Sequence, residues 1–222
     1  MKNIILACLV GFFAFASTAY AESHRSGVRI VYTVEITNIT KGVYFTPFLT
    51  AAHRGNLALF EVGEEASEPL AAIAEGGDIA PMIEYLESRP RLVNGLAQSE
   101  GLLAPGASVR LRLVSDSRMN SLSLASMLLP TNDTFVALNS VALPRRGSAV
   151  FYANAYDAGS EMNDELCMSI PGPQCGGAPF SPEDDGEGYV YPSPGIHGEG
   201  ELTQSAYDWQ GPVAKVVVKR VR

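Results

Sequence analysis

The residues whose types and spacing could do chemistry are carboxylates that fall at the ends of predicted strands. Asp133 lies in a turn between two predicted strands, and Asp157 ends a third strand. Glu161 follows Asp157 across a glycine turn and can fold back toward the same point. Carboxylates gathered at one end of a sheet repel one another, and Ca²⁺, which takes about six to eight oxygen ligands, relieves that repulsion. The spacing alone leaves two interpretations open, a calcium site and, more commonly for acidic residues in turns, ordinary turn formers.

A second candidate for chemistry is His53, one of three histidines in the chain. The sequence contains no Gly-x-Ser-x-Gly, no His-Glu-x-x-His and no phosphate-binding loop. A metal-dependent hydrolase site favours histidine ligands and an open coordination position, which three scattered histidines do not indicate. We therefore expect a non-enzymatic protein, and the alternative is a hydrolase that uses a metal or His53 in a surface cleft.

The N-terminal residues have the pattern of an export signal. Lys2 precedes an apolar run from Ile4 to Ala16, and Ala19-Tyr20-Ala21 supplies the small residues that a signal peptidase recognises. The apolar run is shorter than the ~20 residues needed to span a bilayer. The pattern predicts a signal peptide over residues 1–21, a single domain over residues 22–222, no transmembrane segment after cleavage, and a periplasmic or secreted location.

The predicted export bears on whether the cysteines form a disulfide. Cys167 and Cys175 remain after cleavage, and thiols of exported proteins pair in an oxidising compartment. Two cysteines alone do not make a zinc site, which takes four ligands. We predict a Cys167–Cys175 disulfide that constrains one short loop.

The charge of the chain limits its partners. Sixteen Lys and Arg against 24 Asp and Glu give a net charge of −8. Sequence-independent binding to nucleic acid needs a basic surface, and an anionic membrane repels an acidic protein. The expected partner is an extracellular or periplasmic protein or glycan.

Alternation of apolar and polar residues predicts mostly strands. Val28–Ile36 alternates with a period of two, whereas Pro47 interrupts the apolar run at 43–49, which we interpret as an edge strand or a fixed loop. Helical spacing appears only over 67–76 and 78–86, and residues 160–212 form one long irregular segment rich in Gly and Pro. These patterns predict an all-β fold, an antiparallel β-sandwich of roughly seven or eight strands with a small helical insert. Further strands are predicted at 57–62, 109–113, 121–129, 135–138, 149–156 and 213–221.

Several segments together resemble the spondin N-terminal (F-spondin) domain family, in the form of a stand-alone bacterial-type secreted member. The stretch from Ser126 to Leu138 is similar to a family element in which Ser-Met and a proline lead into an Asp, an aromatic residue and a strand. Tyr156-Asp157-Ala158-Gly159-Ser160-Glu161 is similar to the family's aromatic-Asp-Ala-Gly-Thr-Asp element. The resemblance extends over roughly residues 28–221 and includes Thr46-Pro47-Phe48, 60–67, 70–77 and the closing strand 213–221.

The resemblance implies a calcium-binding β-sandwich of the kind found in extracellular matrix and adhesion proteins. Carried over by position, the metal ligands are Asp133, Asp157 and Glu161, with the main-chain carbonyl of Tyr156 as a fourth. Glu161 stands where the family has Asp, so a ligand is kept but its reach is longer by one methylene. We therefore expect an exported module for binding or adhesion in which Ca²⁺ orders the loops at one end. A purely structural interpretation keeps the fold and leaves the acids as solvated turn residues.

Overall fold

The computed structural model describes residues 28–181 and 186–221, so the predicted signal peptide lies outside the described residues. Within them no helix is both long and apolar enough to cross a membrane. The strands in chain order are β1 (Arg29–Asn38), β2 (Tyr44–Phe45), β3 (Leu49–His53), β4 (Val93–Gln98), β5 (Ser108–Asp116), β6 (Ser121–Leu129), β7 (Thr134–Ala142), β8 (Ser148–Asp157), β9 (Tyr191–Pro192) and β10 (Ala214–Arg220).

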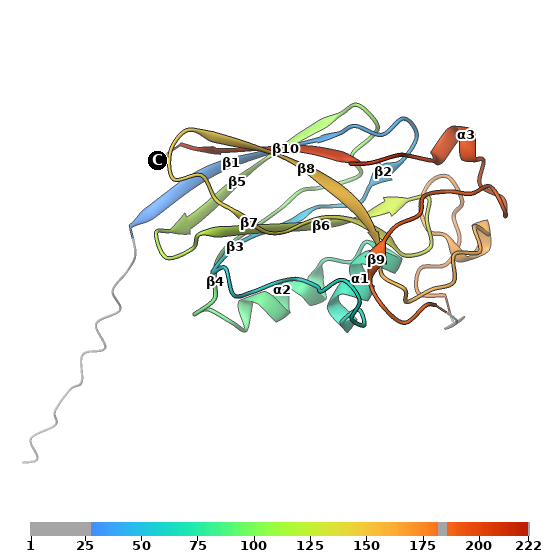
Figure 1. The fold of residues 1–222 in the computed structure, drawn as a ribbon, viewed down its shortest axis with the longest axis horizontal. Coiled ribbons are helices and arrows are strands. Elements are labelled where there is room, and N and C mark those ends of the chain that lie inside the picture. Colours follow the sequence, from blue (N-terminus) through green and yellow to red (C-terminus); the bar gives the residue numbers. More distant parts are fainter. Residues whose placement is uncertain (1–27, 182–185, 222) are drawn as a thin grey trace, which may run out of the picture.

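These strands form two stacked layers of antiparallel sheet, which Figure 1 shows one above the other. The upper layer has the order β5-β1-β10-β8, and the lower layer has the order β8-β7-β6-β3-β4. Strand β8 belongs to both layers, because Ser148–Ala153 pairs with β10 and Asn154–Asp157 pairs with β7. The short strands β2 and β9 pair with β6 and β8. The predicted all-β fold is confirmed.

The space between the layers is filled by inward-facing residues of both sheets. Along β1 the predicted alternation is confirmed, since Val34 and Ile36 are fully buried while their neighbours are partly exposed. Phe45, Phe48 and Leu113 pack in the same cluster. Burial of this apolar surface holds the two layers together.

The helical insert covers the outer side of the lower layer. Helix α1 (Glu68–Gly76) has proline in its first turn and ends at Gly77, whose left-handed φ of 66° suits glycine. Helix α2 (Ala80–Glu87) follows at once, and both helices lie beneath the lower sheet in Figure 1. They build a second apolar cluster with the lower sheet, so β6 is buried along all nine of its residues.

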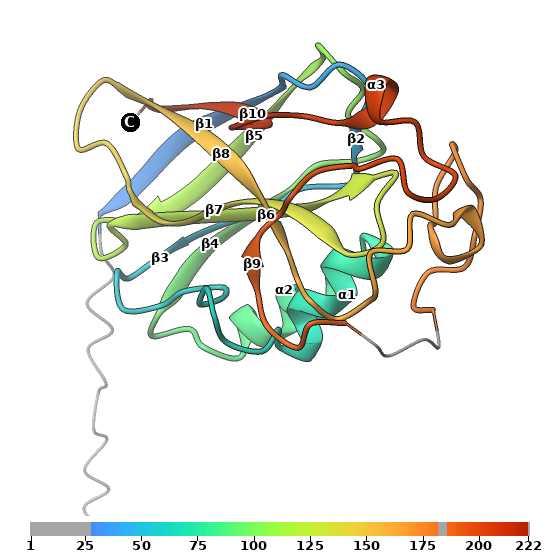
Figure 2. The same cartoon turned by 45° about the vertical axis from the view of Figure 1, so that its right-hand side comes forward.

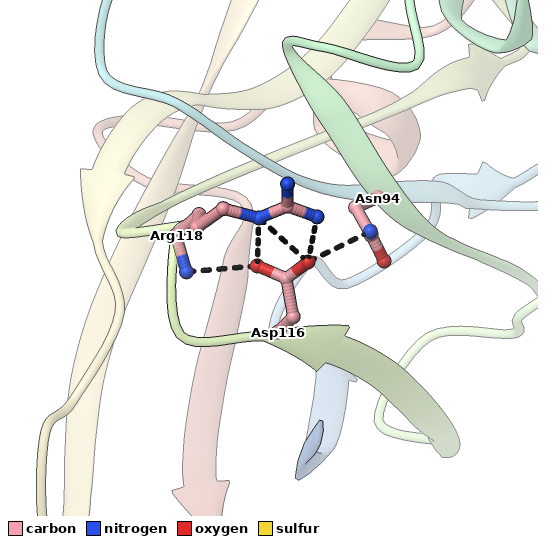
Figure 3. A network of polar contacts seen from close by, with 3 residues as sticks. All are labelled: Asn94, Asp116 and Arg118. Atoms are coloured by element: carbon pink, nitrogen blue, oxygen red, sulfur yellow. Dashed lines mark hydrogen bonds and ion pairs between the residues drawn. The ribbon is translucent and has the colours of Figure 1, made fainter. Parts of the chain in front are cut away.

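Strand β4 was not predicted, and it brings the lower layer close to the upper one. It lies beside β5, and a Cβ placed on Gly95 would come within 2.5 Å of the Val114 carbonyl oxygen. Figure 3 shows the polar clasp of Asn94, Asp116 and Arg118 that joins these strands. Asn94 Nδ2 donates to Asp116 Oδ2 at 2.9 Å, and the Arg118 main-chain N–H donates to Asp116 Oδ1 at 2.8 Å. The Arg118 guanidinium hydrogen-bonds the same carboxylate and lowers its pKa.

The segment Leu57–Val62 is not a strand, contrary to prediction. The side chain of Asn139, and not a neighbouring strand, forms hydrogen bonds with the main chain of this segment. The Leu59 N–H donates to Asn139 Oδ1 at 2.9 Å, and Asn139 Nδ2 donates to the Phe60 carbonyl at 2.7 Å. The side-chain amide satisfies the donor and acceptor that a strand partner would have satisfied.

The predicted irregular segment 160–212 lies at one end of the sandwich. It contains the short elements η1 (Cys167–Ser169), β9 and α3 (Gln204–Tyr207). The predicted Cys167–Cys175 disulfide is present. Its two cysteines pack against a small cluster of Ile170, Ile196 and Leu202, separate from the main core.

Candidate metal centre

Three buried acidic residues, Asp133, Asp157 and Glu161, lie at the end of the sandwich where the β6–β7 turn lies beside the end of β8. The β7–β8 pairing sets Thr134 opposite Asp157, which brings the turn containing Asp133 next to the segment 157–161. Asp133 Oδ2 accepts hydrogen bonds from the N–H groups of Ser160 at 2.8 Å and Glu161 at 3.0 Å. The structure therefore unites the three acids that the sequence singled out.

Asp157 and Glu161 are each held by two hydrogen bonds. Asp157 Oδ1 accepts from the Gly159 N–H, and its Oδ2 accepts from Asn163 Nδ2, both at 2.9 Å. Glu161 Oε1 accepts from the N–H of Ser181 at 2.8 Å and from its hydroxyl at 3.0 Å. Side-chain freedom is low, because every carboxylate is fixed through at least one oxygen.

Two carboxylate oxygens at this site are buried without a partner. Asp133 Oδ1 and Glu161 Oε2 accept no hydrogen bond within the described residues. Asp133 is fully buried and Glu161 is 2% exposed, so solvent does not replace the missing donors. An unpaired polar atom in such a position is costly, and buried polar atoms are normally satisfied.

The electrostatics of the cluster are unfavourable for three negative charges. Burial raises the pKa of Asp133 and of Asp157, and the neighbouring Asp133 charge raises the pKa of Asp157 further. Burial raises the pKa of Glu161 to about 7, with smaller contributions from Glu75 and Asp133. The charged neighbours that raise these pKa values are acidic, so among the described residues no positive charge compensates the ionised forms.

Tyr156, the fourth predicted ligand, is anchored through its ring. The ring centroid lies 4.9 Å from that of Phe60 and 5.9 Å from that of Phe135, in the cluster beneath the lower sheet. The main chain of Tyr156 pairs with Phe135 and with Pro192. Its ring is thus held in the apolar cluster, and the main-chain carbonyl that the resemblance implied as a ligand stays a prediction.

Some residues that support the site were missed. Asn163, Ser181 and Tyr191 all come from the irregular segment 160–212, whose contacts no sequence pattern predicts. The Asn163 amide bridges Asp157 and the Tyr191 hydroxyl, and burial raises the pKa of Tyr191, with Asp157 and Glu187 adding to the shift. Asn163 could have been suspected from its position two residues after Glu161, but Ser181 and Tyr191 had no such signal.

The side chains as they stand do not form a ready-made cage. Among the described residues, no group of three or more His, Cys, Asp and Glu side chains is arranged so that it could hold a metal ion. Glu161 Oε1 is already occupied by the N–H and hydroxyl of Ser181. The donor set nevertheless consists of hard oxygens, and two of them are without partners, which fits the chemistry of Ca²⁺.

His53 does not contribute to this cluster. It pairs with Ser121 at the start of β6, whereas the Asp133 turn follows the end of β6, ~26 Å away along a nine-residue strand. His53 is fully buried: Nδ1 donates to the Arg54 carbonyl at 2.7 Å, and Nε2 accepts from the Ser123 hydroxyl at 2.8 Å. Burial lowers its pKa, so it is a neutral core histidine.

Fold and site together define an all-β module with helices on one face and an acidic cluster at one end. The family model described as Spondin_N matches residues 36–162, more than half of the chain, and the protein belongs to the spondin N-terminal domain family. The matched range includes all three carboxylates and ends just after Glu161. No curated protein matches the chain. Domains of this family are typically extracellular, and the family is not known as an enzyme family.

Proposed function

We propose that the chain is an exported calcium-binding module for binding or adhesion, in which Ca²⁺ orders the loops at one end of the sandwich. The observation that supports this proposal is the pair of buried, unpartnered oxygens on Asp133 and Glu161. They lie in a cluster of carboxylates whose pKa values are raised by burial. A divalent cation would supply the positive charge that the cluster lacks.

The chain's own residues hold the loops together around this point. Asp133 links the β6–β7 turn to the main chain of Ser160 and Glu161, and Glu161 links that segment to Ser181. Ca²⁺ accepts main-chain carbonyl and water oxygens as well as carboxylates. The proposed site therefore combines the Asp133 and Asp157 carboxylates with the Tyr156 carbonyl, and Glu161 joins them by turning its side chain.

Ordered loops suit recognition more than catalysis. A surface that is rigid before its partner arrives loses less conformational entropy on binding. The proposed partner is an extracellular or periplasmic protein or glycan, and we propose no enzymatic activity. Calcium sites of extracellular modules commonly bind with Kd values on the order of 10⁻⁴ to 10⁻³ M.

Thermal and chemical unfolding of the purified protein test the proposal. Metal is first removed with EGTA, and CaCl₂ is then added to about 10 mM, with MgCl₂ in a parallel series. A native-state ligand raises stability by mass action, so we expect a gain that grows with the logarithm of the calcium concentration and reaches about 1–3 kcal/mol, and a smaller gain with magnesium. Unchanged stability at the highest calcium concentration would refute the metal site.

A further inference from the structure

The outer face of the upper sheet carries an uncompensated set of cations. Residues opposite one another in an antiparallel ladder lie on the same face, so the strand register defines this face. Its rows across β5, β1, β10 and β8 are Ser108–Thr37–Lys215–Tyr152, Arg110–Glu35–Val217–Val150 and Arg112–Thr33–Lys219–Ser148. We call these twelve positions the basic face.

Four of the twelve positions are cationic and one is acidic. Glu35 forms an ion pair with Arg110, which leaves Arg112, Lys215 and Lys219 without an ion-pair partner among the described residues. All three side chains are exposed. In a chain of net charge −8 this concentration of positive charge stands out, because the carboxylate cluster and the acidic segment 160–212 lie elsewhere.

Neither α1 nor α2 covers the basic face, which is partly apolar. Helices α1 and α2 lie beneath the lower layer, on the opposite side of the molecule, as Figures 1 and 2 show. Tyr152 is 58% exposed and Val150 is 52% exposed, at neighbouring positions along β8. A shallow depression lined by Val217, Lys219 and Arg110 crosses β10 and β1.

The positive charge continues from the basic face to the adjacent end of the sandwich. Lys219 pairs with Ser148, which follows the β7–β8 turn containing Arg145 and Arg146. Arg220 donates a hydrogen bond to the Arg145 carbonyl at 2.6 Å and lines a depression with both turn arginines. Cations are therefore spaced along β10 and around its end, which suits a ligand that carries repeated negative charges.

We propose that the basic face binds an acidic polysaccharide, a chain of sugars bearing uronate or sulfate groups. A linear polyanion can lie along β10, where Lys215 and Lys219 stand on either side of Val217 on the same face, so that its repeated negative charges meet repeated cations. The flat, exposed ring of Tyr152 offers an apolar surface for a sugar, and the neighbouring Thr and Ser hydroxyls offer hydrogen bonds. This inference goes beyond the proposed calcium function, because the surface is separate from the carboxylate cluster.

Isothermal titration calorimetry with defined probes tests this proposal. The probes are heparin, polygalacturonate and, as an uncharged control, dextran. We expect both polyanions to bind, dextran not to bind, and the affinity to fall as NaCl is raised, because salt screens exposed charges. The titrations are run in EGTA, because calcium itself binds uronate and sulfate groups. Binding without calcium tests the basic face alone, so failure of the calcium site and failure of the basic face are distinguishable.

A charge-reversal pair locates the site. Lys215→Glu/Lys219→Glu should weaken polyanion binding about tenfold or more, because two attractive contacts become repulsive. The matched control is Lys41→Glu/Arg91→Glu, which makes the same change in net charge at exposed positions outside the basic face. Unfolding curves check that both variants fold, and Arg112→Glu on β5 serves as a second variant on the face.

The outcomes separate the alternatives. Equal loss in both double variants would overturn the proposal, because it would show a response to net charge alone. Unchanged binding in the Lys215 and Lys219 variant would do the same. Stronger binding to anionic phospholipid vesicles or to duplex DNA than to the polysaccharides would overturn it as well and assign the face to another class of partner.

Discussion

Each buried carboxylate at the end of the sandwich has its own donors, yet its ionised form is costly where it lies. Asp133, Asp157 and Glu161 accept hydrogen bonds from one loop system and share one small region. Burial raises all three pKa values above those of exposed carboxyls. The metal-free fold therefore gains from proton binding at this end, and calcium competes with protons for the same oxygens.

The first prediction concerns the pH dependence of the metal-free protein. The folded pKa of Glu161 is about 7, above its ordinary value of about 4. A pKa raised by folding contributes stability that is complete below the unfolded pKa and lost as pH rises through the folded pKa. In the metal-free protein we expect the contribution of Glu161 to the free energy of unfolding to fall between about pH 4.5 and 8. Urea unfolding across that range measures it.

The stability gained on adding calcium should rise with pH over the same range, because calcium binds the ionised carboxylates. His53 is a complication, since its lowered pKa gives stability that is present at neutral pH and lost on acidification. It lies far from the cluster and acts equally with and without calcium, so the difference between the two curves removes its effect. A gain that is flat or falls with rising pH would contradict the assignment.

The second prediction is that Asp157→Asn changes two properties in opposite directions. At about pH 8 the amide removes a buried charge beside Asp133, so metal-free stability should rise by about 1 kcal/mol. The Asn163 amide can turn to offer its oxygen to the new N–H group. The calcium response should disappear, because a carboxylate ligand is lost.

Unfolding at the same pH, with and without calcium, measures both effects. The matched control is Asp78→Asn, at an exposed residue whose side-chain oxygen caps the start of α2 through the Ala80 N–H. This control should keep the full calcium response. If Asp157→Asn kept the wild-type response instead, the carboxylate would not be a ligand.

At the residue scale, the acids were predictable and their supporting residues were not. Asp133 and Asp157 stand at the ends of strands with clear hydrophobic patterns, and adjacent strands bring such ends together. Ser181 reaches Glu161 from twenty residues away through an irregular segment. No period or turn motif fixes the path of that segment, because its course depends on tertiary contacts.

At the scale of elements, the turn after β8 depends on a close approach to a distant segment. Gly159 has a φ of 64°, and a Cβ on it would lie 2.3 Å from the Tyr189 carbonyl oxygen. The Gly188 N–H donates to the Gly159 carbonyl at 2.8 Å. Glycine is required here for both conformation and space.

The third prediction compares two glycine variants with the same backbone conformation. Gly147 also has a φ of 64°, but nothing lies within 4 Å of the position that a Cβ would take there. Gly147→Ala should cost about 1 kcal/mol, the conformational penalty alone. Gly159→Ala should cost about 2–4 kcal/mol, because the segment at Tyr189 must move as well. Chemical unfolding measures both, and equal costs would show that the close contact is unimportant.

The elements that the sequence predicted are those with one dominant face. Strand β1 alternates because one side faces the core and the other faces solvent. Strand β6 is different, because sheet covers one side and helices cover the other, and it was predicted from the leucines that alternate with Ser121 and Ser123. Strand β4 was missed because its sequence, Val-Asn-Gly-Leu-Ala-Gln, is mostly half-exposed and contains a glycine that only the contact with β5 explains.

At the scale of the whole molecule, the two apolar clusters share the same strands. Leu124 of β6 and Val136 of β7 face the space between the sheets. Ala125 of β6 and Phe135 of β7 face the helices. Neither cluster can lose its packing without exposing strands that form the other, so the sandwich and the helical layer should unfold together.

The fourth prediction tests this coupling with one variant in each cluster. Leu113 lies between the two sheets, whereas Leu86 belongs to α2 and packs between the helices and the lower sheet, and both residues are fully buried. Leu113→Ala and Leu86→Ala should each lower stability by about 2–5 kcal/mol. Near- and far-ultraviolet circular dichroism should report one coincident transition in both. Separate transitions in Leu86→Ala would show that the helical layer unfolds on its own.

The overall architecture was predictable because the number of strands and their hydrophobic patterns leave few arrangements. The place where the sheet nearly closes was not predictable, because it depends on β4, which was not predicted from the sequence. There the Asn94–Asp116–Arg118 clasp of Figure 3 sets the outer strands of the two layers side by side. Exposed strand edges are templates for pairing with other chains, and in this protein β4 and β5 shield each other. We therefore expect the same clasp to protect against aggregation, so that its loss would appear first as self-association of folded molecules by strand addition.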